Sequence, residues 1–226
     1  DWNDDAPGTT VQRAAGRPVS SVFEVVHAAG GSTAVFSTKT KFSLFDRSWD
    51  AAVDRSTILE EQDARLARAA RRDLLDADRA LTFLHLGIVD QTGHAHGFMG
   101  ASYLRAVERA DALVGTLLRT IDTHASLSDV VVVLTADHGG QGTGHIDATK
   151  LADYRVPFMV WGPGVAHGDL YALNPDYVDP GRSRPDPVGP QPVRNGDLAN
   201  LVTDLLGLGP VPGSLFGRRQ SLDVTG

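Results

Sequence analysis

The stretch VVVVLTADHGGQGTGH, residues 130–145, carries the strongest signal in the chain, because a hydrophobic run leads directly into a set of metal-ligand residue types. The β-branched run 130–134 is too short for a helix and predicts a buried strand. Asp137 and His138 follow its end, and ligands of open α/β sheets bind at the carboxyl ends of strands. A carboxylate with neutral imidazoles suits zinc or a similar divalent ion, so this segment is a candidate metal centre.

A second segment has the same arrangement. Residues 80–86 (ALTFLHL) predict a strand, and Asp90 and His94 follow it. Their spacing of four residues places both side chains on one face of a helical turn, where they can share an ion. Such a spacing arises easily by chance, but its position after a strand repeats that of Asp137. Two strand ends with Asp and His predict a two-metal hydrolase, in which one ion activates the attacking group and the other stabilises the leaving oxygen.

These motifs carry a resemblance to a known family. Asp90-x-x-x-His94, the TADHG at residues 135–139 and then His145 resemble the alkaline phosphatase superfamily, and within it the type I phosphodiesterase and nucleotide pyrophosphatase branch. The resemblance covers most of the chain, with ADHG as its specific part. Further segments resemble the family's helix and strand between the nucleophile and the metal-binding segments, its strand after the Asp-His turn, and its closing helix: residues 21–41, 156–164 and 194–214.

The resemblance implies a cofactor of two divalent metal ions, of the kind of Zn²⁺, and a small-molecule phosphate ester as substrate. Asp90, His94 and His145 are expected to hold one ion, and Asp137 and His138 to help hold the other. The implied reaction is metal-dependent hydrolysis of phosphate esters by a Thr or Ser nucleophile. The resemblance alone suggests an extracellular or periplasmic location.

The nucleophile is not evident in this chain. In the family it lies upstream of the metal ligands, together with an early Asp at the end of the first strand. No hydrophobic strand precedes Asp4 or Asp5, and Thr9 and Thr10 follow a Pro-Gly turn without a strand-to-helix context. Residues 1–226 are therefore expected to form the C-terminal portion of one alkaline phosphatase-like α/β domain, with the nucleophile upstream.

Other functions stay open at this stage. A sulfatase or a phosphomutase of the same superfamily fits the same motifs, although a sulfatase usually needs a modified Cys or Ser upstream. A catalytically inactive metal-binding fragment is the alternative outside enzymes. Monoester, diester and pyrophosphate specificity cannot be distinguished, because no pocket residue is recognisable.

Each proposed ligand also has a structural alternative. Asp137 could cap a helix beside an ordinary strand-end His138, and Asp90 could be a turn residue beside an exposed His94. His145 is the least secure of the five.

The remaining candidates for the site favour structural roles. His96 is expected to be exposed, His167 to lie in a surface turn and His85 to pack in the core. Lys39 and Lys41 could meet a substrate phosphate, but strand-end lysines usually stay solvated.

Composition limits the remaining function classes. At 226 residues with a net charge of −7, the chain has no basic stripe that would bind nucleic acid. It contains no Cys, so disulfides and thiolate ligands are excluded. No apolar run reaches the roughly 18 residues that a membrane span needs.

Alternating strands and helices predict an α/β fold with a mostly parallel central sheet and helices on both faces. A long loop rich in Pro, Gly, Asp and Arg, either a substrate lid or a structural wrap, is expected at residues 169–192. The expected helices are 19–29, 56–77, 102–123 and 195–206, and the expected strands are 32–37, 80–86, 130–134 and 156–161.

Overall fold

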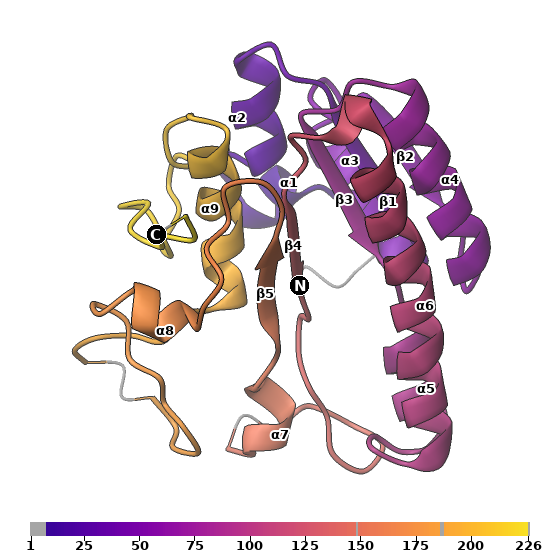
Figure 1. Cartoon of the computed structure of the whole chain (residues 1–226), viewed down its shortest axis with the longest axis vertical. Coiled ribbons are helices and arrows are strands. Elements are labelled where there is room, and N and C mark those ends of the chain that lie inside the picture. The colour runs from indigo at the N-terminus through magenta and orange to yellow at the C-terminus, as the bar shows by residue number, and fades with distance from the viewer. Residues whose placement is uncertain (1–7, 148, 186–187, 226) are drawn as a thin grey trace.

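A three-stranded parallel sheet forms one half of the molecule, as the computed structural model shows (Figure 1). Strand β1 (Thr33–Ser37) lies between β2 (Arg55–Ile58) and β3 (Leu81–His85). The structure describes residues 8–147, 149–185 and 188–225. Because all three strands run in the same direction, their carboxyl ends meet at one edge of the sheet.

Helices cover both faces of β1, whose five residues are all buried. Successive strand side chains point to opposite faces. Val35 packs with Phe23 and Trp49 on one face, while Ala34 and Phe36 pack against helix α4 on the other. The expected α/β class with helices on both faces is therefore confirmed.

The helices alternate with the strands along the chain. Helices α2 and α3 contact the sheet on the side of Val35, whereas α4 contacts it on the side of Phe36 and packs in turn against α6 (Figure 1). Their bounds are α1 Val11–Ala15, α2 Val22–Ala28, α3 Ser43–Ser48, α4 Asp63–Asp76, α5 Ile88–His96, α6 Ala101–Thr123, α7 Leu151–Tyr154, α8 Leu170–Leu173 and α9 Leu198–Leu205. Single 3-10 turns occupy Thr40–Phe42, Ala125–Leu127 and Asn195–Asp197.

Strands β4 (Val132–Thr135) and β5 (Phe158–Trp161) form a separate antiparallel pair. Together with α9 they enclose a small core around Leu201 and Leu222. The prediction of a buried strand at 130–134 was wrong in its degree of burial, because β4 is half-buried throughout. Within the described ranges, β4 pairs on one edge only, with β5, which leaves it less covered than β1.

The expected helix 56–77 was also wrong at its start. Residues 55–58 form β2 instead, and the helix begins at Asp63. Thr57 and Ile58 are β-branched, and pairing with the edge of β1 satisfies their backbone groups. Glu61, with φ 55, makes the turn between strand and helix.

Other boundaries fall close to expectation. Ser21 caps α2 in a capping box with Glu24, and the long loop contains only the one-turn helix α8 as regular structure among its described residues. The N-terminal segment adds helix α1, capped by Thr10, where only turns were expected; Asp4 and Asp5 lie outside the described residues. None of the helices in the described ranges is long and apolar enough to span a membrane.

Candidate metal centre

The turn after β3 positions Asp90. The backbone N–H of Gly87 donates to Thr38 Oγ1 at 2.8 Å, and that of Ile88 donates to Asp63 Oδ1 at 3.1 Å. A side chain at Gly87 would lie 2.9 Å from Thr38 Oγ1, so glycine permits this close approach. These contacts fix the start of α5, whose first turn carries Asp90 at the carboxyl edge of the parallel sheet.

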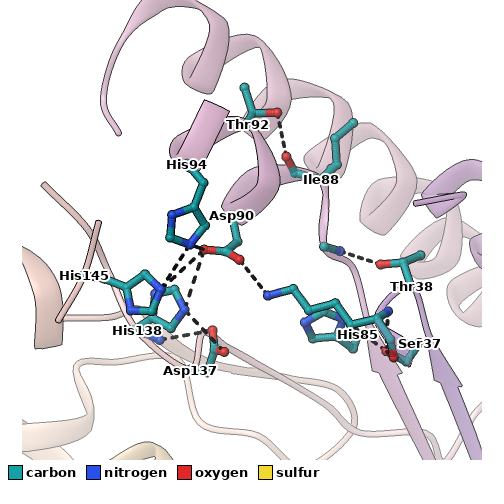
Figure 2. A network of polar contacts seen from close by, with 12 residues as sticks. Ser37, Thr38, His85, Ile88, Asp90, Thr92, His94, Asp137, His138 and His145 are labelled. Atoms are coloured by element: carbon teal, nitrogen blue, oxygen red, sulfur yellow. Dashed lines mark hydrogen bonds and ion pairs between the residues drawn. The ribbon is translucent and has the colours of Figure 1, made fainter. Parts of the chain in front are cut away.

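Three imidazoles converge on one oxygen of Asp90 (Figure 2). The distances from Asp90 Oδ1 are 3.3 Å to His94 Nε2, 3.7 Å to His138 Nε2 and 4.0 Å to His145 Nε2. His94 Nε2 and His145 Nε2 are 3.2 Å apart. Asp90, His94 and His145 each offer one ligand atom, and these atoms all lie within 4.8 Å of one another. They are the three residues that the sequence assigned to one ion.

Asp137 and His138 adjoin this group after β4. The rings of His138 and His145 stack with centroids 3.5 Å apart, and Asp137 Oδ2 lies 3.5 Å from His138 Nε2. The alternative that Asp137 caps a helix was wrong, because the described residues that directly follow it form no helix. Its Oδ1 accepts the backbone N–H of His138 at 3.2 Å, and its carbonyl accepts a hydrogen bond from Asn195 Nδ2 at 3.0 Å.

The hydrogen bonds of the imidazoles fit a cation at this point. His94 Nδ1 lies 2.8 Å from the carbonyl of Thr143, and His138 Nδ1 lies 2.8 Å from that of Gly139. Since a carbonyl only accepts, both Nδ1 atoms carry the proton, and in the neutral rings both Nε2 atoms direct lone pairs toward Asp90.

Asp90 Oδ1 is buried and has no hydrogen-bond partner. Unpaired buried carboxylate oxygens are costly, and a shared positive ion would satisfy the oxygen and the nitrogens together.

Lys39 binds the other oxygen of Asp90, with Nζ 2.6 Å from Oδ2. Burial would raise the pKa of Asp90, but the hydrogen bond and charge of Lys39, followed by His94 and His138, hold it below its ordinary value. Burial and the neighbouring His138 lower the pKa of His145. The cluster therefore combines an ionised carboxylate with a neutral imidazole at neutral pH, which is the protonation that metal binding requires.

Phe98, which lies in the turn between α5 and α6, supports the cluster. A side chain at Gly93 would lie 2.6 Å from the Phe98 ring, and one at Gly140 would lie 2.4 Å from it, so the ring fills the space between these two glycines. Its backbone N–H donates to the carbonyl of Gly142 at 2.7 Å. Phe98 also makes edge contacts with the His94 and His145 rings, and thereby joins α5 to the loop after β4.

The other sequence candidates lie outside the group of ligand atoms. His96 and His167 are exposed, as expected. His85 is half-buried beside Ser37 Oγ at 3.3 Å, and burial followed by Lys39 lowers its pKa to about 4. Lys41 lies over the Phe42 ring.

Sequence reasoning missed Phe98 and Asn195, which no motif marks. Lys39 lies close to Asp90 because β1 and β3 are parallel and their carboxyl ends share one edge of the sheet.

Comparison with known proteins gives the class. Residues 91–207 match the family described as Sulfatase. The chain is 31% identical over 177 residues to GPI ethanolamine phosphate transferase 1 of Aspergillus oryzae, covering 72% of this chain and 17% of that protein. It is 32% identical over 146 residues to the enzyme of the same name from Chaetomium globosum, covering 60% and 15%. The chain thus spans about a sixth of the length of these curated relatives.

Solved structures agree at the level of the fold. A 2-O GAG sulfatase aligns with 91% of this chain and 57% of its own, with a TM-score of 0.54 and 13% sequence identity. Fold and site define a protein of the alkaline phosphatase superfamily, whose members act on phosphate or sulfate esters. Within it, the chain belongs to the sulfatase family.

Proposed function

We propose that this chain carries the metal centre of an enzyme that cleaves phosphodiesters, with zinc-type ions and with a Thr or Ser nucleophile upstream of residue 1. Asp90, His94 and His145 hold one ion, and Asp137 and His138 contribute to the second. The observation that carries the proposal is the unpaired, buried Asp90 Oδ1 facing three imidazole nitrogens.

The ligand types favour zinc over a harder cation. Calcium and magnesium prefer six or more oxygen ligands, whereas zinc accepts imidazole nitrogen together with carboxylate. When bound, such ions polarise the ester oxygens and activate the attacking hydroxyl. The chain's own groups supply the frame: Lys39 keeps Asp90 ionised and oriented, and the carbonyls of Thr143 and Gly139 set the tautomers of His94 and His138.

The relatives support phosphate rather than sulfate chemistry. The fungal relatives are named for transfer of ethanolamine phosphate, which joins and breaks phosphodiester linkages. A phosphodiesterase of the nucleotide pyrophosphatase type would use the same centre with water as acceptor. A sulfatase remains the second candidate because the family match is to sulfatases.

Metal binding is the first test. Titration calorimetry of the chelator-treated chain is expected to show zinc binding at least tenfold weaker in His145→Ala and His94→Ala, since each removes one ligand. His96→Ala is the matched control on the same helix and should bind zinc like the parent. Calcium binding tighter than zinc, or unchanged zinc affinity in His145→Ala, would refute the proposed centre.

Anion preference tests the substrate class. Zinc-loaded protein should bind orthophosphate more tightly than sulfate at pH 8, because the oxygens of phosphate are more basic than those of sulfate, and this gain should vanish in His145→Ala. A zinc-dependent preference for sulfate would favour the sulfatase alternative.

Turnover tests the position of the nucleophile. The chain alone is expected to hydrolyse bis(p-nitrophenyl) phosphate poorly even with zinc, because Thr10 Oγ1 is engaged as the cap of α1, accepting from Arg13 N at 3.1 Å. The Thr92 hydroxyl points away from the histidines and donates to Ile88 O (Figure 2). Robust turnover that is lost in Thr9→Ala or Thr10→Ala would place the nucleophile within the chain instead.

A further inference from the structure

A hollow lies outside the metal centre, between the start of α9 and the C-terminal segment. It has a volume of about 550 Å³, and its lining includes Arg194, Phe216, Arg218 and Arg219. The chain as a whole has a net charge of −7, so a hollow lined by three arginines departs from the general charge of the surface. The one acidic residue of its lining, Asp197, is buried.

Phe216 forms a fixed platform in this hollow. A side chain at Gly196 would lie 2.7 Å from the Phe216 ring, so the ring rests directly on the backbone of Gly196. The fully buried Asn200 donates to the Phe216 carbonyl at 2.6 Å and to Ser214 Oγ at 2.9 Å. Phe216 nevertheless stays 43% exposed. An aromatic ring that packs on the backbone of Gly196 and is still partly exposed offers a preorganised surface for a ligand.

Arg194 is held against the same platform. Its guanidinium lies 5.3 Å from the centre of the Phe216 ring and donates to Gln191 Oε1, while its backbone N–H donates to Asp197 Oδ2 at 2.9 Å. Stacking on an aromatic face fixes the plane of a guanidinium and leaves its remaining donors directed along that plane. Burial raises the pKa of Asp197, against the opposing effects of the Arg194 backbone N–H and the Arg194 charge.

Arg218 and Arg219 complete the positive lining, and both are exposed. Two adjacent surface arginines usually remain solvated, and alone they would define no site. Here they follow the fixed Phe216 and face the same hollow as Arg194. Guanidinium groups bind oxyanions through paired N–H donors, and phosphate matches this geometry.

We propose that this arginine-lined hollow binds a phosphate group, at a site separate from the metal centre. One chain segment links the hollow to the metal centre. Arg194 of the hollow precedes Asn195, whose side chain donates to the carbonyl of Asp137 at 3.0 Å. Binding at the hollow does not depend on metal, so it is separable from the proposed function.

The experiment uses the chelator-treated chain and inorganic phosphate at low ionic strength. Titration calorimetry should show one saturable site, with affinity at least tenfold lower in the double variant Arg218→Ala/Arg219→Ala. Arg65→Ala/Arg68→Ala removes two exposed arginines from α4 and is the matched control for net charge. The exposed positions of Arg218 and Arg219 predict unchanged thermal unfolding. Amide shifts on phosphate addition should centre on residues 217–220 and persist in His145→Ala.

Three results would overturn the assignment. Phosphate binding that is undiminished in the double variant places the anion elsewhere. An equal loss in Arg65→Ala/Arg68→Ala shows that only net charge matters. Sulfate binding more tightly than phosphate at pH 8, where both anions are close to dianionic, contradicts the choice of phosphate.

Discussion

Lys39 Nζ lies 2.6 Å from Asp90 Oδ2, although the two residues are 51 positions apart. The parallel pairing of β1 with β3 brings both to the same sheet edge. The contact occupies Oδ2 and leaves Oδ1 to face the imidazoles. A hydrogen bond to a ligand carboxylate fixes its orientation, so we interpret Lys39 as the residue that positions Asp90.

Lys39→Met should destabilise the fold at neutral pH and make its stability less sensitive to acid. Lys39 holds the pKa of Asp90 below its ordinary value, so this ion pair stabilises the fold above the unfolded-state pKa and is lost as pH falls through the folded-state pKa. Without Lys39, burial raises that pKa, so ionised Asp90 destabilises the variant most at neutral pH, and the difference from the parent shrinks as pH falls through the pKa of Asp90. At neutral pH the cost is about 1–3 kcal/mol, because a partly buried carboxylate loses its partner.

Urea unfolding of metal-free protein across pH 3–8 measures this change. Lys150→Met is the control, since Lys150 forms an exposed pair with Asp147 at 3.6 Å. Equal curves for the parent and Lys39→Met would show that Lys39 does not act on Asp90.

His85→Gln should remove one source of acid sensitivity. The pKa of His85 is lowered to about 4, first by burial and then by Lys39. Below the unfolded-state pKa of about 6.5, His85 binds a proton in the unfolded chain but stays neutral in the fold. The unfolded state therefore gains stability relative to the fold down to about pH 4, by on the order of 2–3 kcal/mol. Glutamine can keep a hydrogen bond to Ser37 without titrating.

The difference in unfolding free energy between the parent and His85→Gln should therefore change between pH 7 and pH 4. The exposed His124 serves as a control, through His124→Gln. A pH-independent difference for His85→Gln would show that His85 is protonated normally in the fold.

The sequence predicted the elements that carry strong local signals. Helix α6 lies where the helix 102–123 was expected, and α2 lies within the expected helix 19–29; both depend on neighbours in the chain. β2 was missed because its strand conformation depends on pairing with β1, a contact that local propensity does not encode. The grouping of the Asp and His residues was expected because ligands of α/β sheets bind at the carboxyl ends of strands, and it holds although β4 lies outside the three-stranded parallel sheet.

Supporting contacts of the site could not be predicted in the same way. Phe98 touches Gly140, and Asn195 touches Asp137, across 42 and 58 positions of chain. Neither residue type marks a ligand or its support. Their roles follow from the tertiary arrangement of α5 and α9 around the loop after β4, and only the coordinates give it.

Gly140→Ala should disturb the site through Phe98. The new methyl group would lie 2.4 Å from the ring, and Gly93 on the other side leaves the ring no space to move. Overpacking of this kind costs about 1–3 kcal/mol and should shift His94 and His145, which contact the ring. Gly144→Ala is the control in the same loop, where a methyl group meets nothing within 4 Å. The thermal unfolding temperature and the zinc affinity should both fall in Gly140→Ala and stay unchanged in Gly144→Ala. Equal behaviour of the two variants would show that packing of Phe98 does not position the histidines.

Asp137→Asn tests the second ion most directly. Asparagine keeps the size of the side chain and an oxygen that can accept the His138 N–H, but it removes the negative charge that a divalent ion requires. Since Asp137 caps no helix and its side chain is 54% exposed, the fold should tolerate the change. Asp147→Asn, at a carboxylate of the same loop whose side chain is 42% exposed, is the matched control. With circular dichroism unchanged, metal analysis should show loss of bound zinc in Asp137→Asn alone, and in a longer form that includes the nucleophile the phosphodiesterase rate should fall by at least tenfold. Full metal content together with full activity in Asp137→Asn would remove Asp137 from the ligands, and with it the assignment of the second ion to this turn.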